Sequence, residues 1–422
     1  MKQEMKPAAS EKRIMGFAPN VFFLGIVSFL TDISSEIIFT LVPLFLANVL
    51  GATTTVIGFV GGLSDSTEAI FKILSGYLSD KINRCKSLAL FGYGFSALSK
   101  PFMLLANSWG IVTGVRFADR VGKGVRSSPR DALIANSVEV YERGRSFGLH
   151  KAMDSLGATL GLGIAAVVIY FTQSGSLTLK PETYTTLVWW GIIPAFLAVL
   201  VLAVFVKEKR RPQNTVQADM KPHFNFRTLF SGMDSRFKLF LLVMFLFTLG
   251  NSSDYFVILR AQDMGVSVLA ISLMLVVFNL TYTLISLPAG LLSDRIGRRR
   301  VIAMGWLFYA LVYLGFAVTQ SQIGIWILFG CYGLYYGIVE GVAKAFVADM
   351  IPPDKRGTAY GLYQGVVGLT LLPASLIAGI LWDSIGSAAP FYFGAALALL
   401  AVIGLLVFIK EPPKKKPADS LG

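Results

Sequence analysis

Long apolar stretches separated by short polar turns run along the whole sequence. They lie at 17–49, 55–80, 87–107, 109–137, 145–171, 186–206, 238–261, 267–293, 301–319, 323–349, 358–382 and 389–409. Each stretch is close to or longer than the roughly 20 residues that an α-helix needs to cross a bilayer. The pattern therefore predicts an all-α membrane protein with twelve transmembrane helices.

Composition supports a membrane protein and argues against a soluble one. Hydrophobic residues make up 54% of the chain and charged residues 15%, and the mean hydropathy is +0.64, whereas a soluble protein has about 25% charged residues. The chain has two cysteines, Cys85 and Cys331, and two histidines, His150 and His223, without the spacing of a disulfide framework or a metal site. We expect no metal and no cofactor.

The net charge of +13 is distributed unevenly between the two sets of connections. One set, which includes both termini and the central connection, holds 27 of the 38 Lys and Arg residues, and the other set holds Lys180 alone. Because cytoplasmic loops of membrane proteins are enriched in Lys and Arg, both termini are expected in the cytoplasm of a bacterial or archaeal cell, with the chain in its plasma membrane. The charge is thus a topology signal, and no nucleic-acid partner is expected.

Two segments recur at nearly one offset. Residues 76–86 (GYLSDKINRCK) match 290–300 (GLLSDRIGRRR) at an offset of 214, and 143–149 (RGRSFGL) match 356–362 (RGTAYGL) at 213. The repeat predicts two pseudo-symmetric six-helix bundles, an architecture of secondary transporters. The predicted units are a tail at 1–16, a bundle at 17–206, a linker at 207–236, a bundle at 237–409 and a tail at 410–422.

The repeated Gly-x-x-x-Asp-Arg/Lys-x-Gly-Arg-Arg/Lys turn resembles the signature of the major facilitator superfamily (MFS), with Asn83 in place of the second glycine in the first copy. The run from Arg120 to Gly124 resembles that superfamily's drug/proton-antiporter pattern, although Lys123 replaces its glutamine. The resemblance implies a twelve-helix secondary transporter that works by alternating access. We accordingly expect a monomer with membrane lipid around it and with no catalytic residue.

The repeated turns also predict a gate. Asp80 and Asp294 end their helices beside basic clusters, where a carboxylate can pair with an Arg or cap a helix of the other bundle. Such contacts form when one side closes and break when it opens. The alternative is that these charges set topology alone. The candidate gating residues are Gly76, Asp80, Arg84, Arg143, Gly290, Asp294, Arg298 and Arg356.

The helix predicted at 109–137 carries an unusual stripe of charge. Seven charged side chains fall within an arc of about 140° at 100° per residue; they are Arg116, Asp119, Arg120, Lys123, Arg126, Arg130 and Asp131. Each such residue facing lipid at mid-membrane would cost about 2.5–3.5 kcal/mol. The helix is therefore expected to line a polar cavity.

Carboxylates in neighbouring helices can balance this stripe, either as a structural network or as part of an ion or substrate path. Because Arg stays protonated and presents a planar fork, the candidate substrate-binding residues are Arg116, Arg120, Lys123 and Arg126, with Tyr336 and Gln364 from the second half. The candidate proton-coupling residues are Asp32, Glu36, Asp65, Glu68 and Asp154. In the more sparsely charged second half, Asp254 interrupts one span, and Glu340 and Lys344 are expected to pair at i, i+4.

These features predict a secondary transporter of a small anionic or zwitterionic organic solute, coupled to H⁺. The alternatives are a multidrug or siderophore-type efflux antiporter and, less favoured, a membrane enzyme acting on lipid phosphate. A Gly-rich Lys-Ser/Thr nucleotide motif is absent from the sequence, which argues against an ATP-driven pump. The direction of transport stays open.

Overall fold

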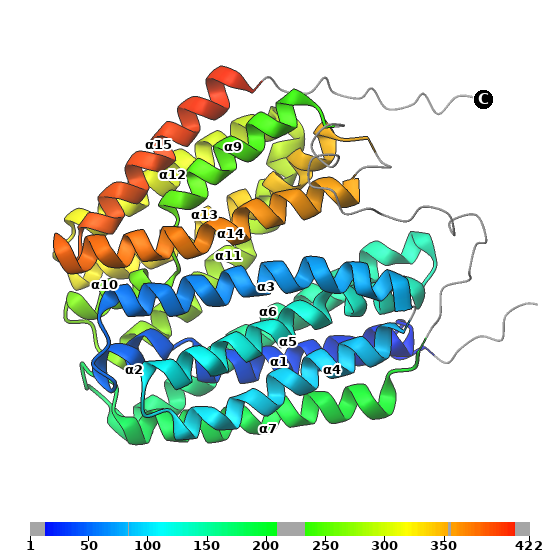
Figure 1. The fold of residues 1–422 in the computed structure, drawn as a ribbon, viewed down its shortest axis with the longest axis horizontal. Coiled ribbons are helices and arrows are strands. Elements are labelled where there is room, and N and C mark those ends of the chain that lie inside the picture. The colour runs from blue at the N-terminus through cyan, green and yellow to red at the C-terminus, as the bar shows by residue number, and fades with distance from the viewer. Residues whose placement is uncertain (1–12, 83, 209–232, 353–355, 410–422) are drawn as a thin grey trace, which may run out of the picture.

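The computed structural model describes residues 13–82, 84–208, 233–352 and 356–409, without the side chains of 77, 79–82, 140 and 356–358. Most of the predicted linker, residues 1–12 of the first tail and all of the second tail, 410–422, lie outside these ranges. The described part of the chain is all α-helical, as the apolar pattern predicts (Figure 1).

In the described residues, each half contains six membrane-length helical units. The first half contains α1 (Pro19–Phe39), α2 (Val42–Asn48), α3 (Thr54–Ile82), α4 (Cys85–Ser99), the 3₁₀ helix η1 (Lys100–Leu105), α5 (Trp109–Asn136), η2 (Val140–Glu142), α6 (Arg143–Gln173) and α7 (Pro181–Phe205). The second half contains α9 (Ser235–Gly250), α10 (Tyr255–Asp263), α11 (Val268–Ile296), α12 (Arg298–Val318), α13 (Gln322–Met350), α14 (Arg356–Ser384) and α15 (Ala389–Phe408).

Ten of these units in the described ranges are long and apolar enough to cross a membrane. The other two are α3 and α5, which are long enough at 29 and 28 residues but carry the charged side chains described below. The twelve spans predicted from the sequence are therefore present.

Three spans that the sequence predicts as continuous helices are interrupted, and this part of the prediction is wrong. The span 17–49 breaks at Thr40, just before Pro43 opens α2, because proline cannot donate a backbone hydrogen bond. The span 238–261 breaks at 251–254, where Asn, Ser and Asp side chains compete for backbone groups. The span 87–107 changes to the 3₁₀ helix η1 at Lys100, next to Pro101.

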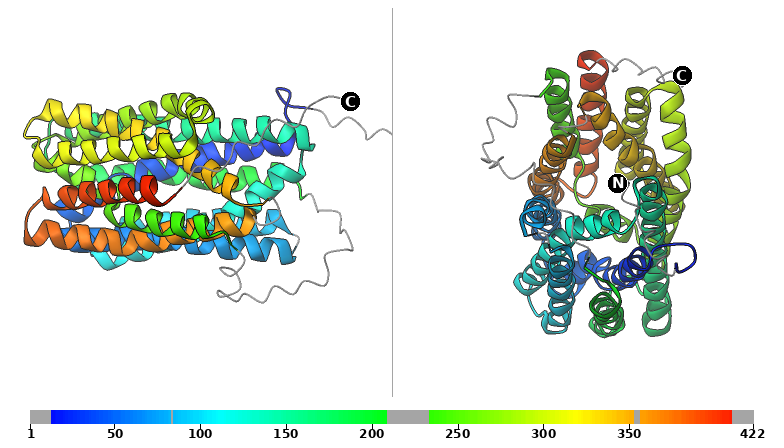
Figure 2. Two further views of the ribbon diagram at one scale, coloured as in Figure 1. Left: turned by 90° about the horizontal axis from the view of Figure 1, so that it is seen from above. Right: turned by 90° about the vertical axis from the view of Figure 1, so that its right-hand side faces the viewer.

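The two halves pack as separate bundles that meet along two helix pairs. Figure 1 shows α1 to α7 below and α9 to α15 above, with α3 and α14 side by side at the boundary, and Figure 2 shows the same division in two further views. The second pair at the boundary is α6 with α11. A cavity that both bundles line must therefore lie between these two pairs.

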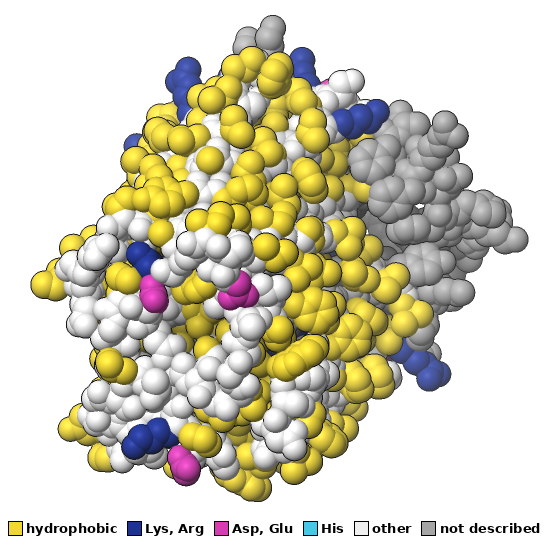
Figure 3. Space-filling model, turned by 60° about the vertical axis from the view of Figure 1, so that its left-hand side comes forward, with side chains coloured by type: hydrophobic (Ala, Val, Ile, Leu, Met, Phe, Trp, Pro, Cys, Tyr) yellow, Lys and Arg dark blue, Asp and Glu magenta, His cyan; other side chains and the backbone are white. Residues whose placement is uncertain are grey.

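The outer surface fits a lipid environment. Large apolar side chains are exposed on many helices, among them Phe171, Trp189 and Leu284, and the face in Figure 3 is dominated by hydrophobic side chains. In water such a surface would be unfavourable, whereas hydrocarbon imposes no such cost. The protein is a multi-pass membrane protein.

We call the end that carries Arg84, Arg143 and Arg298 the basic end, and the other the opposite end. At the opposite end the bundles are hydrogen-bonded to each other: the Asn48 and Gln262 side chains bond at 2.7 Å and 3.1 Å, and the Gln262 amide donates to the Leu177 carbonyl at 2.8 Å. Between described residues, hydrogen bonds across the boundary extend only as deep as Ser66, which donates to the Gly368 carbonyl at 2.6 Å. The bundles are thus held together at the opposite end.

Candidate functional site

A cavity of about 240 Å³ lies between the bundles. The first bundle contributes residues of α1, α5 and α6, and the second contributes residues around the start of α10 and the middle of α11. The lining residues are Asp32, Ser35, Glu36, Phe39, Thr40, Arg116, Asp119, Arg120, Lys123, Leu162, Asp254, Tyr255, Ile258, Leu275, Phe278 and Asn279. This volume fits a small molecule.

Two of the three interrupted spans, 17–49 and 238–261, reach the cavity at equivalent positions of the repeat. Thr40, at the first break, and Asp254, at the second, are separated by the same 214 residues as the repeated turns. Discontinuous helices at matching places in two repeats are a mark of transporter binding sites, because the break exposes polar groups at mid-membrane.

Helix α5 is fixed deep in the first bundle by close backbone contacts. A Cβ added to Gly124 would lie 2.6 Å from Cβ of Phe71 in α3, so only glycine permits this approach. The Ser75 hydroxyl donates to the Gly124 carbonyl at 2.9 Å. These contacts place the charged stripe of α5 inside the protein, as the energetic argument from the sequence predicts.

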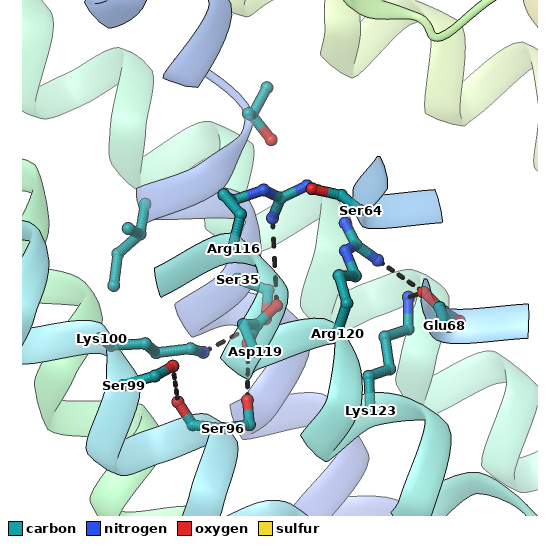
Figure 4. A network of polar contacts seen from close by, with 12 residues as sticks. Ser35, Ser64, Glu68, Ser96, Ser99, Lys100, Arg116, Asp119, Arg120 and Lys123 are labelled. Carbon is teal, nitrogen blue, oxygen red and sulfur yellow. Dashed lines mark hydrogen bonds and ion pairs between the residues drawn. The ribbon is translucent and has the colours of Figure 1, made fainter. Parts of the chain in front are cut away.

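Glu68 of α3 joins two cations of the stripe. Its Oε2 accepts a hydrogen bond from Arg120 Nη1 at 2.6 Å and lies 3.3 Å from Lys123 Nζ. Figure 4 shows both cationic side chains reaching toward this carboxylate. Because Glu68 engages them, their positive charge is partly neutralised.

Arg116 is less completely engaged. Its side chain is 3% exposed, its guanidinium lies 4.5 Å from the Phe39 ring and 6.0 Å from the Tyr255 ring, and Nη1 is 3.9 Å from Asp119 Oδ2. Nε and Nη1 have no hydrogen-bond partner among the described residues. A buried guanidinium with unused donors on a cavity wall is suited to an anionic group.

Lys100 is a second buried cation, behind this wall. The residue is fully buried, and Nζ donates to the hydroxyls of Ser34 at 2.6 Å and Ser35 at 3.2 Å. Its ammonium lies 5.6 Å from the Phe39 ring. Ser35 and Phe39 line the cavity, so Lys100 adds positive charge just outside it.

Two of the predicted proton-coupling residues form a carboxyl pair beside the cavity. Asp32 lines the cavity, and its carboxyl group lies within hydrogen-bonding reach of that of Asp154 in α6. Asp154 also accepts from the Ser28 hydroxyl at 2.8 Å and lies 3.4 Å from Lys151 Nζ. Two carboxyl groups this close can share one proton.

The other predicted carboxylates are distributed differently. Glu36 lines the cavity and accepts from the Thr40 hydroxyl at 2.5 Å. Asp65 lies near Arg116 and Arg120, but the structure shows no ion pair within 4.0 Å for it among the described residues.

The wall from the second bundle carries its own carboxylate. Asp254 lines the cavity, and its Oδ1 accepts from the hydroxyls of Tyr332 at 2.7 Å and Tyr336 at 3.2 Å. These tyrosines belong to a buried aromatic cluster with Tyr309, Tyr313 and Tyr335. The cluster fixes the carboxylate in place.

The remaining predicted binding residues do not line the cavity. The Arg126 guanidinium stacks on Tyr93 at 4.3 Å within the first bundle. Tyr336 supports Asp254 from behind, and Gln364 lies on α14 away from the lining residues. Glu340 and Lys344 pair at 2.7 Å, as their spacing predicts.

The candidate gating residues lie at the basic end, and those described make contacts within one bundle. Arg298 contacts Asp294 at 3.3 Å and Asp349 at 2.8 Å. Gly76 lies beside Ser128 of α5, Gly290 has open space around it, and Arg84 and Arg143 are exposed. The side chains of Asp80 and Arg356 lie outside the described residues.

At the same end Arg13 bonds to Glu142 at 2.6 Å, and this hydrogen bond raises the pKa of the Arg13 guanidinium. The bond ties the segment before α1 to the turn before α6.

Sequence reasoning missed Asp254, Tyr255 and Asn279 as cavity residues. It treated Asp254 as a polar interruption of one span. The signal that identifies Asp254 is its 214-residue separation from Thr40, at the end of α1, because that separation equals the offset of the repeat.

In the described residues, twelve membrane-length helical units form two bundles around a polar central cavity, which is an architecture of secondary transporters. Comparison with known proteins agrees. The chain belongs to the Major Facilitator Superfamily, whose model matches residues 24–259 and 239–421.

Individual relatives are consistent with this family. An uncharacterized MFS-type transporter of Methanocaldococcus jannaschii is 37% identical over 396 residues, which cover 92% of this chain and 94% of the relative. The quinolone resistance protein NorA of Staphylococcus aureus is 25% identical over 153 residues, 36% of this chain and 39% of that protein. The crystal structure of the nucleoside transporter NupG superimposes with a TM-score of 0.70 at 15% identity and covers 92% of this chain and 98% of that one, which shows a shared fold.

Proposed function

We propose that the chain is a secondary active transporter that moves a small anionic or zwitterionic organic solute by alternating access. The observation that carries the proposal is Arg116, a buried guanidinium on the cavity wall whose Nε and Nη1 have no hydrogen-bond partner among the described residues. A bound carboxylate or phosphate would satisfy these donors with charge-assisted hydrogen bonds. The moving units are the bundles 17–206 and 237–409.

Coupling to H⁺ is assigned to the carboxyl pair. Asp32 faces the cavity and Asp154 lies behind it, so a proton shared by the two is within reach of a bound solute. Binding of the solute near Arg116 changes the electrostatic field at Asp32. Solute binding and proton binding are coupled in this way. Glu36, Asp65 and Glu68 are the secondary candidates for this role.

The membrane orientation follows from charge. With the basic end in the cytoplasm, both termini are cytoplasmic and the closed opposite end faces outward. The conformation is then inward-facing. In this state the gating residues Asp294 and Arg298 make their contacts within the second bundle, which leaves them available to close the basic end in the other state.

A ligand screen followed by a transport assay tests the proposal. Purified protein is heated with small carboxylates, phosphorylated metabolites and metal chelates, and we expect members of at least one anionic class to raise its unfolding temperature. Arg116→Gln is expected to lower the affinity for the same compounds at least tenfold, since a charge-assisted hydrogen bond is lost. Equal stabilisation of the variant would contradict the role of Arg116.

The hits are then tested for counterflow in proteoliposomes. Exchange of labelled solute without chemical change supports a transporter, whereas conversion of the compound would favour the membrane enzyme. H⁺ coupling is supported if an imposed pH gradient drives uptake and if the Asp32→Asn variant takes up solute without responding to the gradient. Gradient-independent uptake by the unchanged protein would contradict it.

Efflux of drugs or siderophores by H⁺ antiport is the second candidate, because the chain resembles the quinolone resistance protein over 153 residues. Lipophilic cations would then compete with the anionic hits for the cavity. Expression of the protein in a drug-sensitive host separates the two: protection against several unrelated lipophilic drugs favours efflux, and unchanged sensitivity favours the polar solute.

A further inference from the structure

The charges around the cavity do not add up to a simple anion site. The lining contains three cations, Arg116, Arg120 and Lys123, and four carboxylates. The four are Asp32, Glu36, Asp119 and Asp254. A purely anionic solute would gain contact with the cations but would also sit among a larger number of negative groups.

Most of these charged groups already have partners within the protein. Glu68 engages both Arg120 and Lys123. Asp119 accepts from the Ser96 hydroxyl at 2.6 Å, and Glu36 accepts from Thr40. Asp32 lies against Asp154. Few of the charged groups that line the cavity therefore remain free to bind a ligand.

Two groups keep unused bonding capacity, and they come from different bundles. Arg116 has two donor atoms, Nε and Nη1, without a hydrogen-bond partner among the described residues, and its one ionic contact, with Asp119, is long at 3.9 Å. Asp254 takes both tyrosine hydrogen bonds on Oδ1, and no described residue donates to its Oδ2. The residue is exposed in a cavity deep within the protein, so the free oxygen is accessible to a small solute.

Geometry places these two groups across one cavity. The Arg116 guanidinium lies 6.0 Å from the ring of Tyr255, the residue that follows Asp254. Phe39, Tyr255 and Phe278 supply apolar surface between them. The cavity, of about 240 Å³, is smaller than the roughly 300–1,000 Å³ of most ligand pockets, which favours a small solute.

From this arrangement we infer that the cavity binds a small zwitterion of amino-acid size, with its carboxylate on Arg116 and its ammonium group on Oδ2 of Asp254. This inference rests on the proposed function and narrows it, since a simple anion leaves Oδ2 of Asp254 without a hydrogen-bond donor. One solute bridging both bundles also explains why binding can draw them together: each charged end is held by a different bundle.

The test uses three matched series of compounds on the purified full-length protein. The first series is glycine, β-alanine, 4-aminobutyrate, 5-aminopentanoate and 6-aminohexanoate. The second is the same acids with an acetylated amine, which are anions, and the third is their primary amides, which are cations. Dissociation constants are measured by titration of the unfolding temperature.

We expect at least one chain length of the first series to bind at least tenfold more tightly than both of its derivatives. Asp254→Asn should lower the affinity for this amino acid to that of its acetylated form. The affinity for the acetylated form itself should not change. The change keeps an oxygen for Tyr332 and Tyr336, so the aromatic cluster is preserved. Arg116→Gln should lower the affinity for the same amino acid to that of its amide. Glu182→Gln, at an exposed carboxylate of α7, is the control and should change nothing.

The outcomes separate this inference from the proposed function. If acetylated acids bind as tightly as free amino acids, with dependence on Arg116 and not on Asp254, the zwitterion is overturned and an anion transporter stands. If the amides bind as tightly as the amino acids, both the zwitterion and the anionic class are overturned. If no compound of the three series binds, the inference that the cavity binds a zwitterion of amino-acid size is overturned. The broader screen of anions then still decides the proposed function.

Discussion

At the scale of single residues, Glu68 determines whether the cationic wall of the cavity is stable. It is the shared partner of Arg120 and Lys123, and its side chain is 24% exposed. Glu68→Gln leaves two positive charges side by side, of which Arg120 is only 17% exposed to water. We expect the free energy of unfolding in detergent to fall by about 1–3 kcal/mol, because partly buried charges lose their partner. Chemical denaturation measures this change.

A second variant shows whether repulsion is the cause. Adding Lys123→Gln to Glu68→Gln removes one of the two facing cations and should restore at least half of the lost stability. Glu182→Gln, which removes an exposed carboxylate, should cost less than about 0.5 kcal/mol. If the double variant is less stable than Glu68→Gln, the repulsion argument is wrong.

How much of the site the sequence predicts depends on the kind of signal each residue leaves. The charged stripe of α5 is predictable because several ionised side chains on one helix face cannot lie in lipid. Arg126 belongs to the same stripe, yet it stacks on Tyr93, because the stripe is longer than the cavity. Asp254 is a single carboxylate in an apolar span, and its partners Tyr332 and Tyr336 lie 78 and 82 residues further along the chain, so local pattern alone does not reveal it.

At the scale of helices, Asp383 connects the two bundles at the opposite end. This residue near the end of α14 accepts hydrogen bonds from the backbone N–H groups of Thr54 and Thr55, at 3.2 Å and 2.8 Å, and from both hydroxyls. A carboxylate at the start of α3 is stabilised by the helix dipole, and such caps contribute about 0.5–2 kcal/mol. Asp383→Asn is therefore expected to shift the conformational equilibrium toward an open opposite end by about 2- to 30-fold.

Spin labels at Leu177 and Ile385, both exposed at this end, measure the shift. Opening should increase the fraction of molecules in which the two labels are far apart. Asp263→Asn is the matched control, since Asp263 is an acidic residue at the same end that bonds to Arg260 and Ser387 within the second bundle. Its distances should match those of the unchanged protein. A similar shift in both variants would show that loss of charge, rather than the cap on α3, opens this end.

Helix positions follow closely from the sequence, whereas helix breaks do not. Hydropathy marks ten of the twelve described spans, and helix length marks α3 and α5, because a helix needs about 20 residues to cross the lipid. A break of a few residues leaves the apolar count nearly unchanged, as at Thr40 and at 251–254. Breaks are visible in sequence only through Pro43 and through the polar run before Tyr255. Both signals also occur in unbroken helices: Pro129 lies inside α5.

At the scale of the whole molecule, the position of the interbundle bonds determines from which side the cavity can be reached. Between described residues these bonds lie at the opposite end and at the α3–α14 boundary, as far as Ser66. Lys123, on the cavity wall, keeps 39% of its side chain exposed. If the basic end is cytoplasmic, a water-soluble reagent should therefore reach position 123 from the cytoplasm and not from outside.

Labelling with a membrane-impermeant maleimide tests orientation and access together, in a background with Cys85 and Cys331 replaced by Ala. Lys123→Cys should react in inside-out vesicles and react at least tenfold more slowly in intact cells. Two exposed positions calibrate the sides: Ser174→Cys, at the opposite end, should react in cells, and Glu139→Cys, between α5 and α6, only in inside-out vesicles. Reversal of both calibrating positions would invert the topology. Correct calibration with rapid labelling of position 123 in cells would instead show that the resting protein opens outward, because closure at Asn48, Gln262 and Asp383 would then not persist in the membrane.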